Sequence, residues 1–140
     1  MAITVGQRAL RTAVRQHHEA VGQLTAGDSP TSALLLFYAT ECALKAALMS
    51  RMSLADTSSL ADEYGHDLAR LAKELNLSNE ISIPRALRTR HNRTSSSIAM
   101  KDAHQAWRYG ETLRDEDHVA AIHCFRQIID WYKRERGGAL

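Results

Sequence analysis

The stretch from Ser29 to Met52 constrains the fold of this chain more than any other. No Gly or Pro interrupts it after Pro30, and Ala and Leu, both strong helix formers, dominate its composition. Ser29 can accept a hydrogen bond from an otherwise unpaired N–H at a helix start, and proline suits the first helical position. Because apolar residues cover most of its circumference, the stretch predicts a helix that other elements bury on several sides.

A narrow polar edge runs along the same helix, formed by Tyr38, Glu41 and Lys45. Glu41 and Lys45 are four residues apart, a spacing at which opposite charges pair on a helix surface. Polar groups at this frequency are not typical of a membrane-spanning segment. We therefore expect a core helix and no membrane association.

The chain of 140 residues has the length of one domain, and we expect a single helical domain over 1–140. Its two cysteines, Cys42 and Cys124, lack the CxxC spacing of redox or zinc sites. We interpret both as small reduced core residues, which predicts a reducing compartment. The N-terminal residues have no apolar segment of the kind found in signal peptides, so the expected localisation is cytoplasmic.

Apolar residues at helical spacing predict a first helix over 4–24 and a last helix from about 114 to 136. Shorter helices are expected over about 58–64, after Asp67, and around Pro84.

The stretch 91–110 is the least regular, with a loop expected over 93–97. No segment shows strand alternation that would support a sheet. The sequence thus predicts an all-α fold, an antiparallel up-and-down bundle of about five helices.

Positive charge is unevenly distributed, although the formal net charge is only +2. Clustered cations can form a local binding patch on a nearly neutral protein. One stripe lies on the first predicted helix and consists of Arg8, Arg11 and Arg15. A second cluster has no acid within it and is our candidate for RNA contact: Arg85, Arg88, Arg90 and Arg93.

Arg108 is a further candidate RNA contact, within the group Trp107-Arg108-Tyr109. These aromatic residues could stack on bases. The alternative, which we favour, is that the group closes one end of the bundle and places Arg108 over a ring.

The sequence contains no phosphate-binding loop, dinucleotide fingerprint, paired-cysteine zinc motif or nucleophile elbow, so we expect neither a metal nor a cofactor. Arginine and histidine together can cleave RNA without a metal, because histidine moves protons and arginine stabilises charge on phosphate. The candidate pair is Arg114 with His118, and the runner-up is Arg88 with His91. His66 is expected to bond locally at a helix start.

The order of three short motifs resembles the HEPN superfamily of small helical domains. They are Glu41-Cys-Ala-Leu-Lys45, Gly65-His66-Asp67-Leu68 and Arg108-Tyr109, within a resemblance that spans about residues 8 to 132. The resemblance implies a four-helix core and a homodimer. It also implies a role in toxin–antitoxin or phage-defence systems, as a ribonuclease or as a module that binds RNA or a partner such as a small nucleotidyltransferase.

The catalytic signature of that family is Arg-x(4–6)-His, near the start of a late helix. Arg85 and His91 have this spacing but lie early in the chain, whereas Arg114 and His118 lie in the right region with only three residues between them. Our leading hypothesis is therefore a dimeric module that binds RNA or a partner protein. The alternatives are a metal-independent endoribonuclease and a helical adaptor with no nucleic-acid role.

Overall fold

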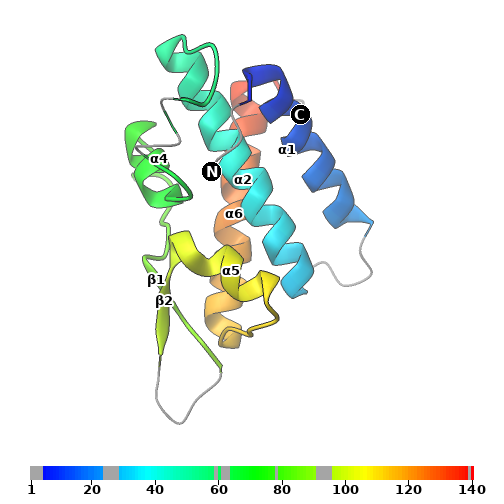
Figure 1. Ribbon diagram of the computed structural model, residues 1–140, viewed down its shortest axis with the longest axis vertical. Helices are drawn as coiled ribbons and strands as arrows, with labels where there is room; N and C mark the ends of the chain where they lie inside the picture. The colour runs from blue at the N-terminus through cyan, green and yellow to red at the C-terminus, as the bar shows by residue number, and fades with distance from the viewer. Residues whose placement is uncertain are drawn as a thin grey trace.

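Helix α2 (Pro30–Met52) forms the centre of the computed structural model, and the other helices pack around it (Figure 1). The structure describes residues 5–23, 29–58, 60, 64–77, 79–90, 96–138 and 140. Within these ranges the surrounding helices are α1 (Gln7–Gly22), α4 (Leu68–Glu74), α5 (Ala103–Arg108) and α6 (Asp115–Glu135). The predicted all-α bundle is confirmed. The helix expected over 58–64 falls mainly on residues outside the described ranges.

Both ends of α2 follow from local chemistry. The Oγ of Ser29 accepts a hydrogen bond from the backbone N–H of Ser32 at 3.1 Å, as expected for a helix cap. At the other end Ser53 adopts a left-handed conformation with φ of 53°, which stops the helix. Between these points Phe37, Leu44 and Met49 have no exposed surface. Burial on several sides is thus confirmed.

By length and hydropathy alone, α2 could also cross a membrane. Of its most apolar window, 67% is buried inside the domain. Core helices of bundles can have the same length and hydropathy, and α2 packs as such a helix does, with other helices around it.

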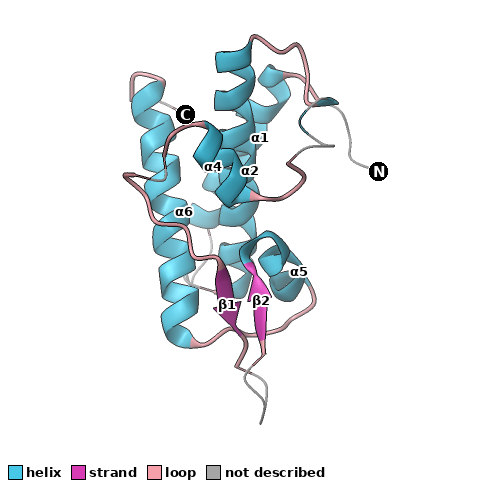
Figure 2. Ribbon diagram, turned by 90° about the vertical axis from the view of Figure 1, so that its left-hand side faces the viewer, coloured by secondary structure: helices cyan, strands magenta, loops and turns pink. Residues whose placement is uncertain are grey.

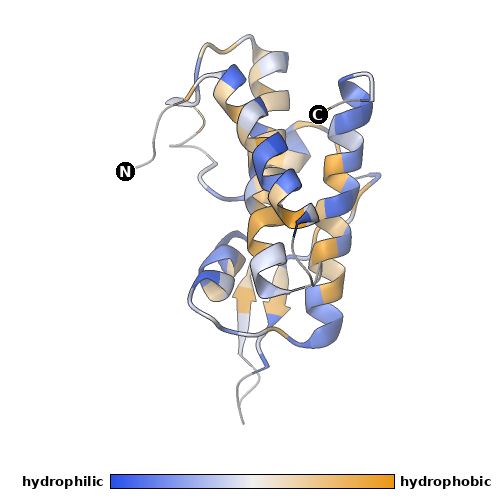
Figure 3. Cartoon of the chain, turned by 90° about the vertical axis from the view of Figure 1, so that its right-hand side faces the viewer, coloured by the Kyte–Doolittle hydropathy of each residue, from blue (hydrophilic) through white to orange (hydrophobic). Residues whose placement is uncertain are grey.

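Helices α1 and α6 supply most of the remaining core. α1 runs antiparallel to α2, as the short connection predicts, and buries Leu10, Val14 and Val21 (Figure 1). α6 packs against another side of α2, and hydrophobic and hydrophilic residues alternate in colour along its ribbon, as expected for a helix with one apolar face (Figure 3). It ends before Gly137, whose φ of 78° suits a glycine after a helix.

A two-stranded hairpin lies beside α5 and the start of α6, which corrects two of our expectations (Figure 2). Strands β1 (Ala86–Arg88) and β2 (Ser97–Ala99) pair antiparallel, with Leu87 opposite Ile98. The helix expected around Pro84 and the absence of strands are both wrong. Proline lacks an N–H and disfavours helical geometry in the residue before it, so the chain stays extended here.

The stretch expected to be irregular is also more ordered than its sequence indicates. After β2, a 3₁₀ turn η1 (Met100–Asp102) leads directly into α5. α5 buries Ala103, His104 and Trp107 against the bundle. The expected loop over 93–97 falls mainly outside the described residues, and its last residue, Ser97, is in β2.

Phe37 offers a test of this core. Its ring centroid lies 5.1 Å from His104 and 5.8 Å from Phe125. Phe37→Ala should lower the free energy of unfolding by about 3–5 kcal/mol, because it removes buried apolar surface and leaves a cavity. Urea denaturation followed by circular dichroism measures this change. Val119→Ala is the matched control, since Val119 is 61% exposed and should change stability by less than about 0.5 kcal/mol.

Candidate functional site

The three motifs that support the family resemblance lie far apart in the sequence but meet in one place. α2 supplies Glu41 and Lys45, the turn before α4 supplies His66, and α5 supplies Arg108. A network of side-chain contacts connects these segments. We call it the His66–His104 cluster, and it consists of Tyr38, Glu41, His66, His104 and Arg108.

Glu41 is the buried anion of this cluster, with only 8% of its surface exposed. Its Oε1 contacts the Nδ1 of His66 in a short hydrogen bond and lies 3.8 Å from the Nζ of Lys45. A carboxylate at this depth needs such partners, because an unpaired buried charge is costly. The predicted Glu41–Lys45 pair is thus confirmed. The expectation that His66 bonds locally is wrong, since its partner lies on α2.

His66 combines a fixed ring with access to solvent. The Glu41 carboxylate occupies Nδ1, which leaves Nε2 on the other side of the ring, and 52% of the side chain is exposed. A carboxylate at one ring nitrogen selects the tautomer in which that nitrogen carries the proton. The arrangement therefore presents Nε2 of His66 as a proton acceptor.

His104 lies behind His66, with the two ring centroids 4.4 Å apart. It is 4% exposed and stacks on Phe37, and its Nδ1 has no well-formed hydrogen bond within the described residues. Burial lowers the pKa of His104, and the neighbouring His66 and Arg108 side chains lower it further, while Glu41 and the Lys101 backbone oppose this. His104 is therefore held in its neutral form at neutral pH.

Arg108 forms the exposed rim of the cluster. Its Nη2 donates a hydrogen bond to the Oη of Tyr38, and its guanidinium carbon lies 5.9 Å from the centre of that ring. Trp107 is 5% exposed, whereas Tyr109 is 78% exposed. The favoured expectation, in which the group closes the bundle and Arg108 lies over a ring, is confirmed for Trp107 and Arg108. Tyr109 instead faces solvent.

Sequence reasoning did not single out His104, because it lies in the stretch that had no clear periodicity. A usable signal exists, since His104 and Arg108 are four residues apart and so share a face of any helix that contains both. His17 of α1 also lies next to the His66–His104 cluster, because its ring centroid is 5.9 Å from that of Tyr38.

The candidate pair Arg114 and His118 lies at the start of α6, outside the His66–His104 cluster. Arg114 is the residue before the first helical turn, and its carbonyl accepts a hydrogen bond from the His118 N–H at 2.9 Å. The ring of His118 is 6.3 Å from Trp107 and lines a pocket of about 220 Å³ that also includes Arg90. The catalytic role of this pair stays a prediction.

The second arginine cluster has acidic partners that its own sequence does not show. Arg88 binds Asp117 through two guanidinium nitrogens at 3.0 and 2.9 Å, and Arg90 lies 3.1 Å from Asp115. The cluster has no acid within its own sequence, but the first turn of α6 supplies acidic partners to these two arginines. Hydrogen bonding to Arg88 lowers the pKa of Asp117.

The other candidate RNA contacts in that cluster are placed differently. Arg85 is exposed and lines a pocket of about 650 Å³ beside α4. His91 and Arg93 lie outside the described residues, so the structure does not test the runner-up pair Arg88–His91. RNA contact by Arg85, Arg88, Arg90 and Arg93 stays a prediction.

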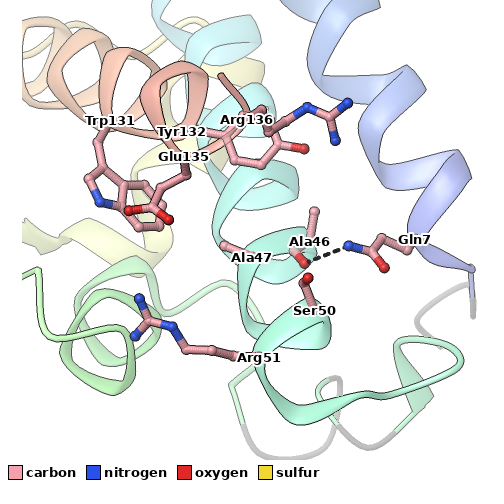
Figure 4. Close-up of a pocket in the computed structure, with 9 residues that line it drawn as sticks. All are labelled: Gln7, Ala46, Ala47, Ser50, Arg51, Trp131, Tyr132, Glu135 and Arg136. Carbon is pink, nitrogen blue, oxygen red and sulfur yellow. Dashed lines mark hydrogen bonds between the residues drawn. The ribbon is translucent and has the colours of Figure 1, made fainter. Parts of the chain in front are cut away.

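Two further pockets lie outside the three motifs. The arginine stripe of α1 is exposed, and Arg8, Arg11 and Arg15 line a pocket of about 370 Å³ with Arg136. Another pocket, of about 340 Å³, lies where α1, α2 and the end of α6 meet, and in it Gln7 donates to the Ala46 carbonyl at 3.3 Å (Figure 4). Neither pocket contains a side chain of the His66–His104 cluster. We place the candidate site at that cluster, because side chains of all three motifs belong to it or contact it.

Neither cysteine belongs to the His66–His104 cluster. Cys42 and Cys124 are free thiols, and burial raises the pKa of each to about 11. A thiol with so high a pKa is a poor nucleophile at neutral pH. Among the described residues, no group of three or more His, Cys, Asp or Glu side chains is arranged to hold a metal ion.

Comparisons of the chain with protein-family models, with curated proteins and with solved structures found no match. The resemblance to the HEPN superfamily therefore depends on the three motifs.

The lowered pKa values of His17, which is half-buried, and of the buried His104 predict how stability changes with pH. Burial lowers the pKa values of His17 and His104 below 6.5, so the unfolded chain binds protons on them at a higher pH than the folded chain does. The free energy of unfolding should therefore fall as the pH drops from 7.5 to 5.5. Urea denaturation at several pH values measures this slope.

His104→Phe keeps an aromatic ring against Phe37 but removes the titrating group, so it should make the slope shallower. His123→Phe, a change at an exposed histidine of α6, serves as the control. If His104→Phe leaves the pH dependence of the free energy of unfolding unchanged, His104 does not cause that dependence.

Proposed function

We propose that this chain is an HEPN-like RNA-binding domain that contacts single-stranded RNA through Arg108 and Tyr109. The observation that carries the proposal is the pairing of an oriented guanidinium with a neighbouring aromatic side chain that is 78% exposed. The alternatives are a partner-binding or purely adaptor role and, as the sequence also suggested, an endoribonuclease.

Arg108 has the chemistry of a phosphate contact. A guanidinium presents several N–H donors in a plane and remains charged at any physiological pH. The hydrogen bond and ring contact with Tyr38 restrict its orientation, so less side-chain freedom is lost on binding. Arg88 and Arg90 form ion pairs with carboxylates of α6, whereas no carboxylate within the described residues forms an ion pair with Arg108.

Tyr109 has the chemistry of a base contact. Its side chain is 78% exposed, so the ring is available to a ligand. Aromatic rings stack on unpaired bases of any sequence, and a phosphate contact beside them is the common arrangement in proteins that bind single strands. The adjacency of Arg108 and Tyr109 therefore favours RNA over a protein partner.

The convergence of Glu41, His66 and Arg108 supports the resemblance itself. Glu41 contacts His66 directly, and Tyr38 and His104 connect this pair to Arg108, so side chains of all three motifs belong to one cluster. The resemblance further implies a homodimer, which remains part of this proposal.

The test is fluorescence anisotropy with a labelled single-stranded RNA over a range of salt concentrations. Wild-type affinity should fall with rising salt, because each neutralised phosphate releases counterions. Tyr109→Ala should weaken binding by roughly tenfold, consistent with the loss of about 1–3 kcal/mol of stacking. Arg108→Ala should weaken binding and reduce the salt slope by about 0.7, the value for one phosphate on a single strand.

Arg134→Ala is the matched control, since Arg134 is an exposed arginine in the last turn of α6. It should leave the affinity within about twofold, whereas Arg108→Lys should recover only part of the wild-type affinity because it restores charge but not planarity. Binding that is independent of salt, or equal in Arg108→Ala and wild type, would contradict the proposal.

A further inference from the structure

A pocket lined by arginines lies between the start of α1 and the end of α6, apart from the His66–His104 cluster and from Tyr109. We infer that this arginine pocket binds inorganic polyphosphate, a linear chain of linked phosphates, through four guanidinium groups. They belong to Arg8, Arg11 and Arg15 of α1 and to Arg136 at the end of α6. The inference concerns a second site and is independent of the proposed RNA-binding function.

The arginine pocket collects positive charge from two helices. Arg8, Arg11 and Arg15 are separated by three and four residues, so they form one row along α1. Arg136 follows the last turn of α6, and Figure 4 shows its side chain directed toward α1. Together with the half-buried Thr12, these side chains line a volume of about 370 Å³. Four permanent charges therefore face one small volume, and a ligand that neutralises them must itself carry several negative charges.

This arrangement costs stability in the unbound protein. Arg8 lies in the first turn of α1, where the helix dipole disfavours a positive charge and where no acid is present. Arg11 and Arg15 are like charges four residues apart, a spacing that destabilises a helix. Among the described residues, no carboxylate forms an ion pair with any of the four arginines. Locally unfavourable charge of this kind is typical of a functional surface, and a bound anion would offset its cost.

The guanidinium of Arg136 is restricted before any ligand binds. Its central carbon lies 5.8 Å from the centre of the Tyr132 ring, which is buried. Contact with a fixed aromatic face limits side-chain freedom, so less entropy is lost on binding. A planar guanidinium can donate two parallel hydrogen bonds to one phosphate, and the hydroxyl of Thr12 adds a further donor to the pocket.

Positive charge continues beyond the arginine pocket on the side of α6 that faces α1. Burial lowers the pKa of His18 on α1, and the cations Lys133 and Arg126 of α6 lower it further. The acids Asp130 and Glu19 act on His18 in the opposite direction. Since Lys133 and Arg126 act on His18, both lie near α1. A ligand longer than the pocket therefore meets further cations of α6.

The surroundings of the pocket favour linked phosphates over a nucleic-acid strand. Proteins that bind single strands combine phosphate contacts with aromatic rings that stack on the bases. Trp131 and Tyr132, the aromatic residues of the neighbouring pocket in Figure 4, are only 6% and 4% exposed. Linked phosphates have no bases to stack, and each unit accepts the bidentate hydrogen bonds that guanidinium groups donate.

The experiment is isothermal titration calorimetry of the full chain with inorganic tripolyphosphate and with a longer polyphosphate. Wild type should bind both, and more weakly as salt rises, because salt screens exposed charges. Arg11→Ala should weaken tripolyphosphate binding by about tenfold or more, as expected for the loss of a charge-assisted hydrogen bond. Lys133→Ala should weaken binding of the longer chain but not of tripolyphosphate.

Arg134→Ala is the matched control, because Arg134 is exposed at the same end of α6 but does not line the pocket. It should leave both affinities within about twofold, the usual effect of an exposed charge.

Arg11→Glu separates a loss of binding from a loss of fold. The introduced carboxylate lies between Arg8 and Arg15, at spacings at which opposite charges attract on a helix. Thermal unfolding of unliganded Arg11→Glu, followed by circular dichroism, should therefore have a midpoint equal to or above that of wild type. Tripolyphosphate should raise the midpoint of wild type but not that of Arg11→Glu, because a ligand stabilises only a protein that binds it.

Reciprocal measurements keep this inference separate from the proposed function. Arg108→Ala should bind tripolyphosphate as wild type does, and Arg11→Ala should bind single-stranded RNA as wild type does. Absence of RNA binding would contradict the proposed function and leave the polyphosphate site standing.

Three results would overturn the inference. The first is that neither phosphate chain binds at low salt. The second is equal weakening by Arg11→Ala and Arg134→Ala, which would indicate general attraction between charges and no site. The third is tighter binding of polyglutamate or of RNA than of polyphosphate at the pocket, lost in Arg11→Ala, which would assign the pocket to an acidic protein segment or to nucleic acid.

Discussion

Helix α2 is buried on most of its surface, and α1, α4, α5 and α6 all pack against it. This arrangement is possible because most of its side chains are apolar, with Ala and Leu the commonest, and apolar groups can be buried without hydrogen-bond partners. Ser32, Thr40 and Glu41 are its buried polar residues, and the charged one, Glu41, has Lys45 and His66 beside it. The packing requirement of one helix therefore fixes where the turn before α4 must lie. The candidate site follows from that requirement.

The short segments between α4 and α6 position the remaining groups. The β1–β2 hairpin joins the start of α6 through Arg88 and Asp117, and the carbonyl of Arg88 accepts the N–H of Arg114 at 2.9 Å. α5 follows the hairpin and brings His104 under His66 and Arg108 over Tyr38. The arginines of the hairpin thus serve the architecture, whereas the arginine of α5 is presented to solvent. This difference is why we propose that Arg108 and Tyr109, and not the hairpin arginines, contact RNA.

Several features could be predicted from the sequence because they depend on neighbours in the chain. The cap at Ser29, the span of α2, the N-terminal cap at Asp67 and the extent of α6 all follow from local propensity and helical spacing. The hairpin and α5 could not be predicted in the same way. A three-residue strand such as Ala86–Arg88 shows too little alternation to recognise, and its stability comes from a partner strand and from α6.

The sequence by itself determined a helical bundle centred on α2 and named most of the polar groups that matter, including Glu41, His66 and Arg108. Tertiary structure decided which of these groups meet, because their contacts join residues 25 to 70 positions apart. It also decided that Arg88 and Arg90 are paired with acids of α6, which no local charge pattern reveals. The physical reason is that helical spacing reports which side of an element is buried, but not which other element buries it.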